Sequence, residues 1–156
     1  MLANEVFRQL RFIFNWSEAD IVEIFKLVDA IENEVTIQTW LHKPEHESFI
    51  KMKDIEFATF LNGFIIAQRG KREGPSPKPE TLLNNNIILR KLKIALKLKD
   101  TDILDLFHSV DLRLSKHELS AFFRNPKQAQ YRECQDQFLR NFLFGLKKKY
   151  RPESGL

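Results

Sequence analysis

The chain has a single cysteine and no long apolar run, and each shortage excludes a class of protein. Because Cys134 is the only cysteine among 156 residues, no internal disulfide can form, which argues against a disulfide-rich secreted domain. No apolar stretch approaches the roughly 18 residues that a membrane-spanning helix needs. The N-terminal sequence MLANEVFRQLRF lacks the basic start, apolar block and cleavage site of a signal peptide. We therefore expect a cytoplasmic protein with no membrane partner.

The sequence also lacks the motifs of common catalytic and cofactor sites. No glycine-rich nucleotide-binding pattern and no GxSxG motif occurs. His42 and His46 have the spacing of two ligands on one helical face, but Pro44 lies between them and ends the helix. An enzyme would need a pocket that gathers His108 or His117 with carboxylates. We predict no metal, no cofactor and no catalysis.

Charge is distributed unevenly along the chain. Residues 1–70 hold 7 Lys/Arg and 11 Asp/Glu, a net charge of −4, whereas residues 71–156 hold 18 and 10, a net charge of +8. The sum is the overall charge of +4. An acidic half and a basic half suggest an anionic partner for the second half, attraction between the halves, or simply two solvated surfaces of different charge.

An internal duplication explains much of the sequence. When residues 4–70 are compared with residues 86–152, a shift of 82, 14 of 67 positions are identical without a gap. Average residue usage would give roughly 4 by chance. We expect a first repeat at 1–70, an exposed Pro/Gly-containing linker at 71–85, a second repeat at 86–152 and a tail at 153–156.

Each repeat is predicted to hold four helices, so the fold class is all-α. The first helices, about 4–14 and 86–97, show one apolar face, and Asn4 and Asn86 at their starts are expected to be N-caps. The second and third helices have helix-turn-helix dimensions and begin at capping-box sequences, SEAD at 17–20 and SKHE at 115–118. The fourth helices are expected at about 54–69 and 136–150.

The fourth helices share the tetrads FLNG at 60–63 and FLFG at 142–145. A glycine inside a helix costs about 1 kcal/mol relative to alanine, so its repetition suggests a benefit from close packing. The close approach is expected either between the two fourth helices or inside each repeat. The residues predicted to serve repeat packing are Phe60, Leu61, Gly63, Phe142, Leu143 and Gly145.

Three segments carry a resemblance to a known family: NNNIILRKLKIALKLKDTDI, FLNGFIIAQRGKR and RECQDQFLRNFLFGL. With the duplication, they make the chain similar to the bacterial YehS family of small proteins with two copies of a domain of unknown function. The resemblance spans residues 1–150 and implies a bacterial, cytoplasmic, duplicated helical protein. It implies no activity and no site residues.

The repeated carboxylates do not require a catalytic site. They are the pairs Asp20/Asp102, Asp29/Asp111 and Asp54/Asp136. All fall at predicted helix ends, where capping, interaction with the helix dipole and turn formation explain them.

Two binding functions stay open. A protein–protein interaction or adaptor module, including self-association, is favoured because tandem helical units present grooves and the halves differ in charge. The alternative is a DNA- or RNA-binding protein that uses the basic second repeat. Its candidate anion contacts are Arg90, Lys91, Lys93, Lys97, Lys99, Lys116, Arg124, Lys147, Lys148, Lys149 and Arg151.

Overall fold

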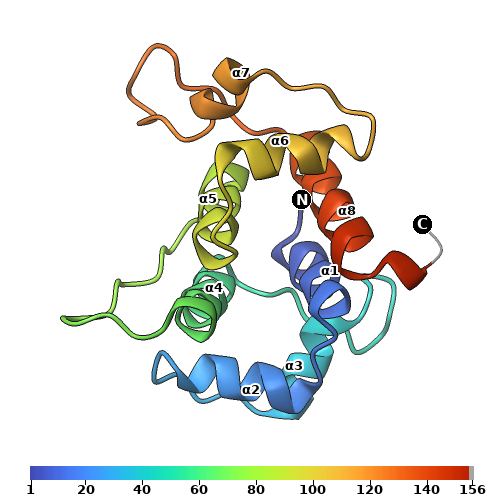
Figure 1. The fold of residues 1–156 in the computed structure, drawn as a ribbon. Helices are drawn as coiled ribbons and strands as arrows, with labels where there is room; N and C mark the ends of the chain where they lie inside the picture. The colour runs from blue at the N-terminus through green and yellow to red at the C-terminus, as the bar shows by residue number, and fades with distance from the viewer. Residues whose placement is uncertain (155–156) are drawn as a thin grey trace. The chain divides into compact units, whose positions relative to one another are not determined.

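The computed structural model describes residues 1–154, and the chain divides into two compact units, Met1–Leu83 and Asn84–Leu156. The first unit is built from helices joined by loops (Figure 1). In chain order, its helices are α1 (Ala3–Phe14), α2 (Glu18–Lys26), α3 (Glu34–Leu41) and α4 (Asp54–Arg69).

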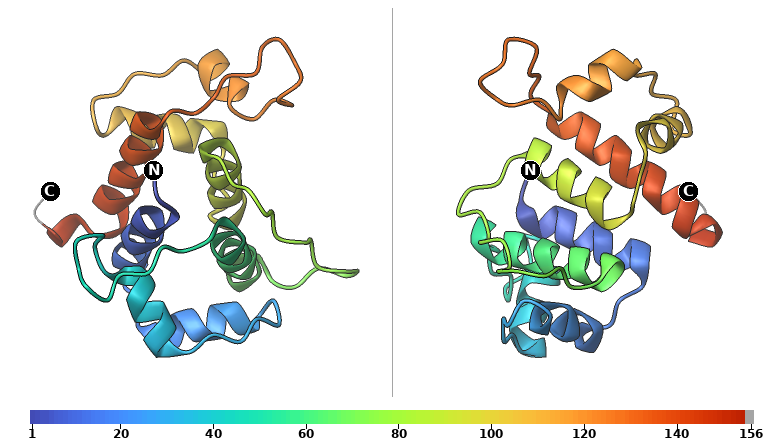
Figure 2. Two further views of the ribbon diagram at one scale, coloured as in Figure 1. Left: turned by 180° about the vertical axis from the view of Figure 1, so that it is seen from behind. Right: turned by 60° about the vertical axis from the view of Figure 1, so that its left-hand side comes forward.

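The second unit repeats this order and adds one short 3-10 helix. Its elements are α5 (Asn85–Ala95), α6 (Asp100–His108), α7 (Lys116–Ala121), α8 (Asp136–Tyr150) and η1 (Pro152–Ser154). The loop after α7 runs outward before it returns to the start of α8 (Figure 2). Helices and no strands are found among residues 1–154, which confirms the all-α class and the two tandem helical copies. The expected tail overlaps η1, and residues 155–156 lie outside the described residues.

The two predicted capping boxes are confirmed. At the start of α2, the Ser17 N–H donates to the Asp20 carboxylate at 2.8 Å, and the Asp20 N–H donates to Ser17 Oγ at 3.1 Å. Ser115 and Glu118 make the same reciprocal pair before α7, at 3.1 and 3.0 Å. Each pair satisfies two N–H groups that have no partner inside the helix.

The repeated asparagines are not N-caps, so that prediction was wrong. Leu2 is the N-cap of α1, and the side chain of Asn84 caps α5 by accepting from the Ile87 N–H at 2.8 Å. Asn4 and Asn86 lie inside the helices and are buried, with exposed fractions of 0% and 3%. A buried amide must find hydrogen-bond partners, which gives these residues a different role.

Each buried asparagine clamps the first helix of its unit to the end of the third helix and to the loop before the fourth helix. Asn4 Nδ2 donates to the carbonyls of Trp40 at 3.0 Å and Ile50 at 2.9 Å, while its Oδ1 accepts from the Met52 N–H at 2.8 Å. The second unit repeats the clamp: Asn86 bonds the Phe122 carbonyl, the Arg132 carbonyl and the Cys134 N–H at 3.0, 2.8 and 2.9 Å. We call these contacts the asparagine clamps.

Aromatic rings fill much of the core. In the first unit, Phe7 lies edge-on to Trp40, Phe57 and Phe60, with ring centroids 5.0 to 6.2 Å apart. In the second unit, Phe107 and Phe142 have centroids 6.3 Å apart. Such tilted and edge-on pairs are favourable beyond their buried area.

The two mid-helix glycines let a neighbouring helix approach within their own unit. A Cβ atom at Gly63 would collide with the main-chain oxygen of Ile24 in α2. A Cβ at Gly145 would lie 2.7 Å from the main-chain oxygen of Leu106 in α6, closer than Cβ atoms pack in proteins. The repeated glycine therefore allows the second and fourth helices of each unit to touch backbone to backbone.

The segment after α4 is an extended loop (Figure 1). It begins at Gly70, whose φ of 84° favours glycine, and it has no helix or strand through residue 83. At its far end, the Leu83 N–H donates to the Asp54 carboxylate at 2.9 Å, which ties the segment to the start of α4. No helix in the described part of the chain is both long and apolar enough to cross a membrane.

Candidate interaction surfaces

Repeated carboxylates at four helix starts hold local structure. Asp20 and Asp102 accept main-chain hydrogen bonds at the first turns of α2 and α6. Asp54 accepts the Leu83 N–H, and Asp136 accepts from the side chain of Asn85 at 2.7 Å. The hydrogen bond from Asn85 lowers the pKa of Asp136. These hydrogen bonds explain why the aspartates occur in both units: they stabilise the starts of the helices, and no catalytic role is needed to explain them.

Four residues adopt the left-handed conformation at equivalent turns of the two units. Asp29 and Asp111 do so after the second helices, with φ of 58° and 61°. Asn15 and Lys97 do so after the first helices, both with φ of 55°. Aspartate and asparagine tolerate this conformation better than lysine does. Lys97 thus lies beyond the end of α5, whereas the sequence analysis expected the helix to extend to about residue 97.

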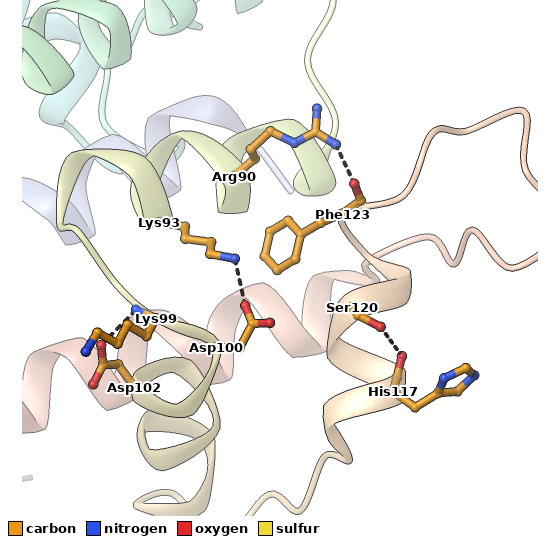
Figure 3. Close-up of polar contacts among 8 residues, drawn as sticks. All are labelled: Arg90, Lys93, Lys99, Asp100, Asp102, His117, Ser120 and Phe123. Atoms are coloured by element: carbon orange, nitrogen blue, oxygen red, sulfur yellow. Dashed lines mark hydrogen bonds and ion pairs between the residues drawn. The ribbon is translucent and has the colours of Figure 1, made fainter.

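Two of the candidate anion contacts on α5 have partners inside the second unit (Figure 3). Arg90 donates to the Phe123 carbonyl at 3.2 Å. Lys93 pairs with Asp100 at 2.7 Å and lies 4.4 Å from the centroid of the Phe123 ring. These contacts tie α5 to the start of α6 and to the chain after α7. Arg90 and Lys93 therefore contribute to the structure whether or not they bind a ligand.

Other candidates are spread over different elements. Lys91 is half-buried on α5. Lys99 is the N-cap of α6, and its main-chain N–H donates to the Asp102 carboxylate (Figure 3). Lys116 is exposed at the first turn of α7, while Arg124 is half-buried after it. α7 spans only 6 residues and begins eight positions after His108, the last residue of α6. This connection is longer than the 3–4-residue turn of a helix-turn-helix motif.

The end of α8 carries a run of basic residues. The last turn contributes Lys147, Lys148, Lys149 and, just beyond the helix, Arg151. Two aromatic side chains are also exposed there, Phe144 at 38% and Tyr150 at 39%. We define the α8 surface as Arg140, Phe144, Lys148 and Lys149, all of which are exposed.

A hollow of about 330 Å³ adjoins the α8 surface. Lys148 and Lys149 line it together with Leu106, Gly145, Ser109, Asp102 and Asp105. The Lys148 ammonium donates to the Ser109 carbonyl at 3.0 Å, which holds this side chain at the rim. The hollow therefore combines an apolar floor with charged walls.

The first unit exposes an apolar cluster that the sequence analysis did not identify. Ile31 is 91% exposed, Val35 71% and Leu27 39%. Acidic side chains surround them in the sequence: Glu23, Asp29, Glu32 and Glu34. We define the α2–α3 surface as these seven residues.

The second unit does not repeat this cluster. At the positions equivalent to Leu27, Ile31 and Val35, a shift of 82, it has Ser109, Arg113 and His117. A search for positions where the repeats differ, rather than agree, would have found the cluster from sequence.

Glu32 is the half-buried member of the α2–α3 surface. Partial burial, with a smaller effect from the nearby Glu56 carboxylate, raises the pKa of Glu32 above its ordinary value of 4.5. A raised pKa means that the folded protein disfavours the charged form of this side chain. A cation placed against the surface would lower that cost.

Comparison with known proteins finds a family and a relative whose names state no function. The family described as "Protein of unknown function (DUF1456)" matches residues 3–70 and again residues 85–152. The chain is 40% identical over 156 residues to the "Uncharacterized protein YehS" of Escherichia coli (strain K12), covering 99% of this chain and 100% of that protein. No solved structure matches.

Proposed function

The chain belongs to the DUF1456 family of proteins of unknown function, and we propose that it is a non-catalytic protein-interaction module. Its α2–α3 surface would bind a basic, partly apolar segment of a partner protein. The observation that carries the proposal is the exposure of Ile31 and Val35, at 91% and 71%.

The free energy gained by burying apolar side chains explains why such a surface favours binding to a partner. Fully burying an aliphatic side chain of this size is worth about 1.5–3 kcal/mol, so two of them can anchor an interface. The acidic side chains around them add selectivity, because they attract a basic partner and repel an acidic one. An amphipathic helix with lysines or arginines beside its apolar stripe fits this chemistry.

Site-specific photo-crosslinking in cells tests the proposal. We would place a photoreactive phenylalanine analogue at Val35 and, as the matched control, at His117, the equivalent position of the second unit. We expect adducts at Val35 in which the captured peptide carries Lys or Arg beside apolar residues. The adducts should disappear when Glu32→Lys and Glu34→Lys are combined. Equal adducts at Val35 and His117, or adducts that survive the charge reversal, would overturn the proposal.

Nucleic-acid binding through the α8 surface is the second candidate. Exposed lysines beside an exposed Phe144 ring are the combination that binds single strands, by phosphate contact and base stacking. Arg90 and Lys93 tie α5 to the start of α6 and to the chain after α7, so their replacement would also disturb the packing of the second unit. Lys148 bonds the Ser109 carbonyl, so Lys149→Glu is measured alone as well as with Lys148→Glu. We would titrate salt against single-stranded RNA and DNA for the single and the double variant.

The nucleic-acid candidate predicts binding that falls steeply with salt and is lost in this double variant. Lys127→Glu, in the exposed loop after α7, is the control for a charge reversal elsewhere in the second unit. Binding that is unchanged by Lys148→Glu and Lys149→Glu would exclude the α8 surface as the nucleic-acid site.

A further inference from the structure

We infer that the occupant of the α2–α3 surface is the α8 surface of a second copy of this chain, so that copies assemble head to tail. The inference rests on the proposed function, since it names the partner of the same site. The two surfaces have opposite charge: one carries Glu23, Asp29, Glu32 and Glu34, and the other carries Arg140, Lys148 and Lys149.

The distribution of charge along the chain also favours head-to-tail association. The stretch that holds the α2–α3 surface, residues 1–70, has a net charge of −4, and residues 71–156, which hold the α8 surface, have a net charge of +8. Opposite charges on the two units favour contact between the first unit of one copy and the second unit of another.

The apolar side chains also match. Phe144 offers an exposed ring, and aromatic rings are preferred anchors of interfaces. Beside it, the hollow of about 330 Å³ above Leu106 and Gly145 can accept a branched aliphatic side chain such as Ile31. Asp102 and Asp105 in the wall of the hollow would face Lys26, the lysine that precedes Leu27.

The duplication gives an internal comparison. The first unit has Ala58, Asn62 and Ile66 where the α8 surface has Arg140, Phe144 and Lys148. The second unit has Ser109, Arg113 and His117 where the α2–α3 surface has its apolar side chains. The α2–α3 surface thus occurs in the first unit and the α8 surface in the second. One chain therefore carries one surface of each kind. Contacts between unlike surfaces are heterologous and build rings or open chains of copies.

Mixing two defective variants tests the inference. The full chain is studied by sedimentation velocity over a wide concentration range, at about 0.05 M and about 1 M salt. Wild type is expected to associate with increasing concentration and to dissociate at high salt. Ile31→Asp with Val35→Asp, and separately Lys148→Glu with Lys149→Glu, should each weaken association at least about 100-fold.

An equimolar mixture of the two variants should form a one-to-one dimer and nothing larger. The first variant keeps an intact α8 surface and the second an intact α2–α3 surface, so one complete interface remains. Arg113→Asp with His117→Asp, at the equivalent turn of the second unit, is the control and should associate like wild type. The Cys134 thiol is buried in the second unit, so its protection from labelling reports that this unit is folded in each variant. Far-UV circular dichroism reports the helix content of both units.

A wild type that stays monomeric at all concentrations would overturn head-to-tail assembly, and so would variants whose mixture stays monomeric. If wild type is monomeric while Val35 crosslinks a different basic protein, this inference fails and the proposed function stands. If Val35 crosslinks no more than His117, the proposed function fails. Loss of RNA binding without loss of association in the Lys148→Glu, Lys149→Glu variant assigns the α8 surface to nucleic acid and also overturns the inference.

Discussion

The side-chain oxygen of Asn86 accepts a hydrogen bond from the main-chain N–H of Cys134 at 2.9 Å, across 48 residues of chain. The same amide donates to two main-chain carbonyls. One buried side chain therefore supplies main-chain hydrogen bonds that a neighbouring strand would supply in a sheet. Asn4 repeats the arrangement in the first unit. In the second unit Asn85 adds further long-range contacts, because its side chain donates to the Cys134 carbonyl and to the Asp136 carboxylate.

Asn86→Ala should destabilise the second unit by about 2–4 kcal/mol. The substitution removes three hydrogen bonds and leaves buried main-chain groups without partners, which costs more than the bonds are worth in water. Chemical denaturation followed by circular dichroism measures the loss. Asn141→Ala, which removes an amide that donates to the Gln137 carbonyl within α8, should change stability by about 0.5 kcal/mol or less. Similar effects for the two variants would contradict the clamp.

Cys134 should resist alkylation in the folded protein. The thiol is buried, and burial raises its pKa to about 12, with the Asp136 carboxylate adding to the effect. At pH 8 only a fraction on the order of 10⁻⁴ would be thiolate, the reactive form. Iodoacetamide labelling followed by mass spectrometry should therefore report local opening. Asn86→Ala should speed labelling at least about tenfold, and labelling of the wild type at the rate of a free thiol would refute this account.

Helices were predictable here because their signals are local. Ser17 with Asp20, and Ser115 with Glu118, form caps within four residues, and both were identified from sequence. The role of Asn4 was not, because its partners Ile50 and Met52 are more than 40 residues away. A pattern at the start of a helix cannot distinguish a cap from a buried clamp without the loop that comes to meet it.

The candidate surfaces, like the asparagine clamps, could be predicted from the sequence only in part. Repeated residues attract notice, yet Arg90 and Asp102 repeat because they hold the backbone. The exposure of Ile31 depends on packing around the turn between α2 and α3, which the hydrophobicity of the residue does not reveal. Comparison between repeats is more informative for function where they differ than where they agree.

Gly145→Ala should lower stability by about 1–3 kcal/mol, although alanine is the better helix former. The new Cβ would lie 2.7 Å from the Leu106 oxygen, and a main-chain carbonyl can give way only if α6 moves as a whole. Thermal or chemical unfolding measures the effect. Gln137→Ala, at an exposed position of the same helix, is the control and should be neutral or slightly stabilising. A stabilising Gly145→Ala would mean that the helices are not in backbone contact.

Lys97→Gly should stabilise the second unit by about 0.5–1 kcal/mol. Lysine is strained at a φ of 55°, and the relief exceeds the extra freedom that glycine gives to the unfolded chain. The reciprocal change is a direct control: Asn15→Lys places lysine in the same turn of the first unit and should be destabilising by a similar amount. Both are read from denaturant midpoints. A loss of stability in Lys97→Gly would show that the side chain of Lys97 has a structural role that outweighs its backbone strain.

Glu32→Gln should stabilise the first unit near neutral pH, and the gain should depend on pH in a defined direction. Burial raises the pKa of Glu32 above 4.5, so the folded state binds its proton more tightly than the unfolded state does. The wild type therefore loses stability as pH rises from 4.5 through the raised pKa, and the loss is complete above it. Glutamine has no such titration, so its advantage should be absent below pH 4.5 and present at pH 7.

Denaturant midpoints of both proteins between about pH 3.5 and 7.5 measure this difference. Glu34→Gln removes the same charge from an exposed neighbour and is the control for net charge alone. An advantage of Glu32→Gln that is equal at both ends of the range would show that burial does not oppose the charge. The measurement also bears on binding: a basic partner that stabilises ionised Glu32 should reduce the advantage of glutamine, because the cation repays the cost of burying the carboxylate.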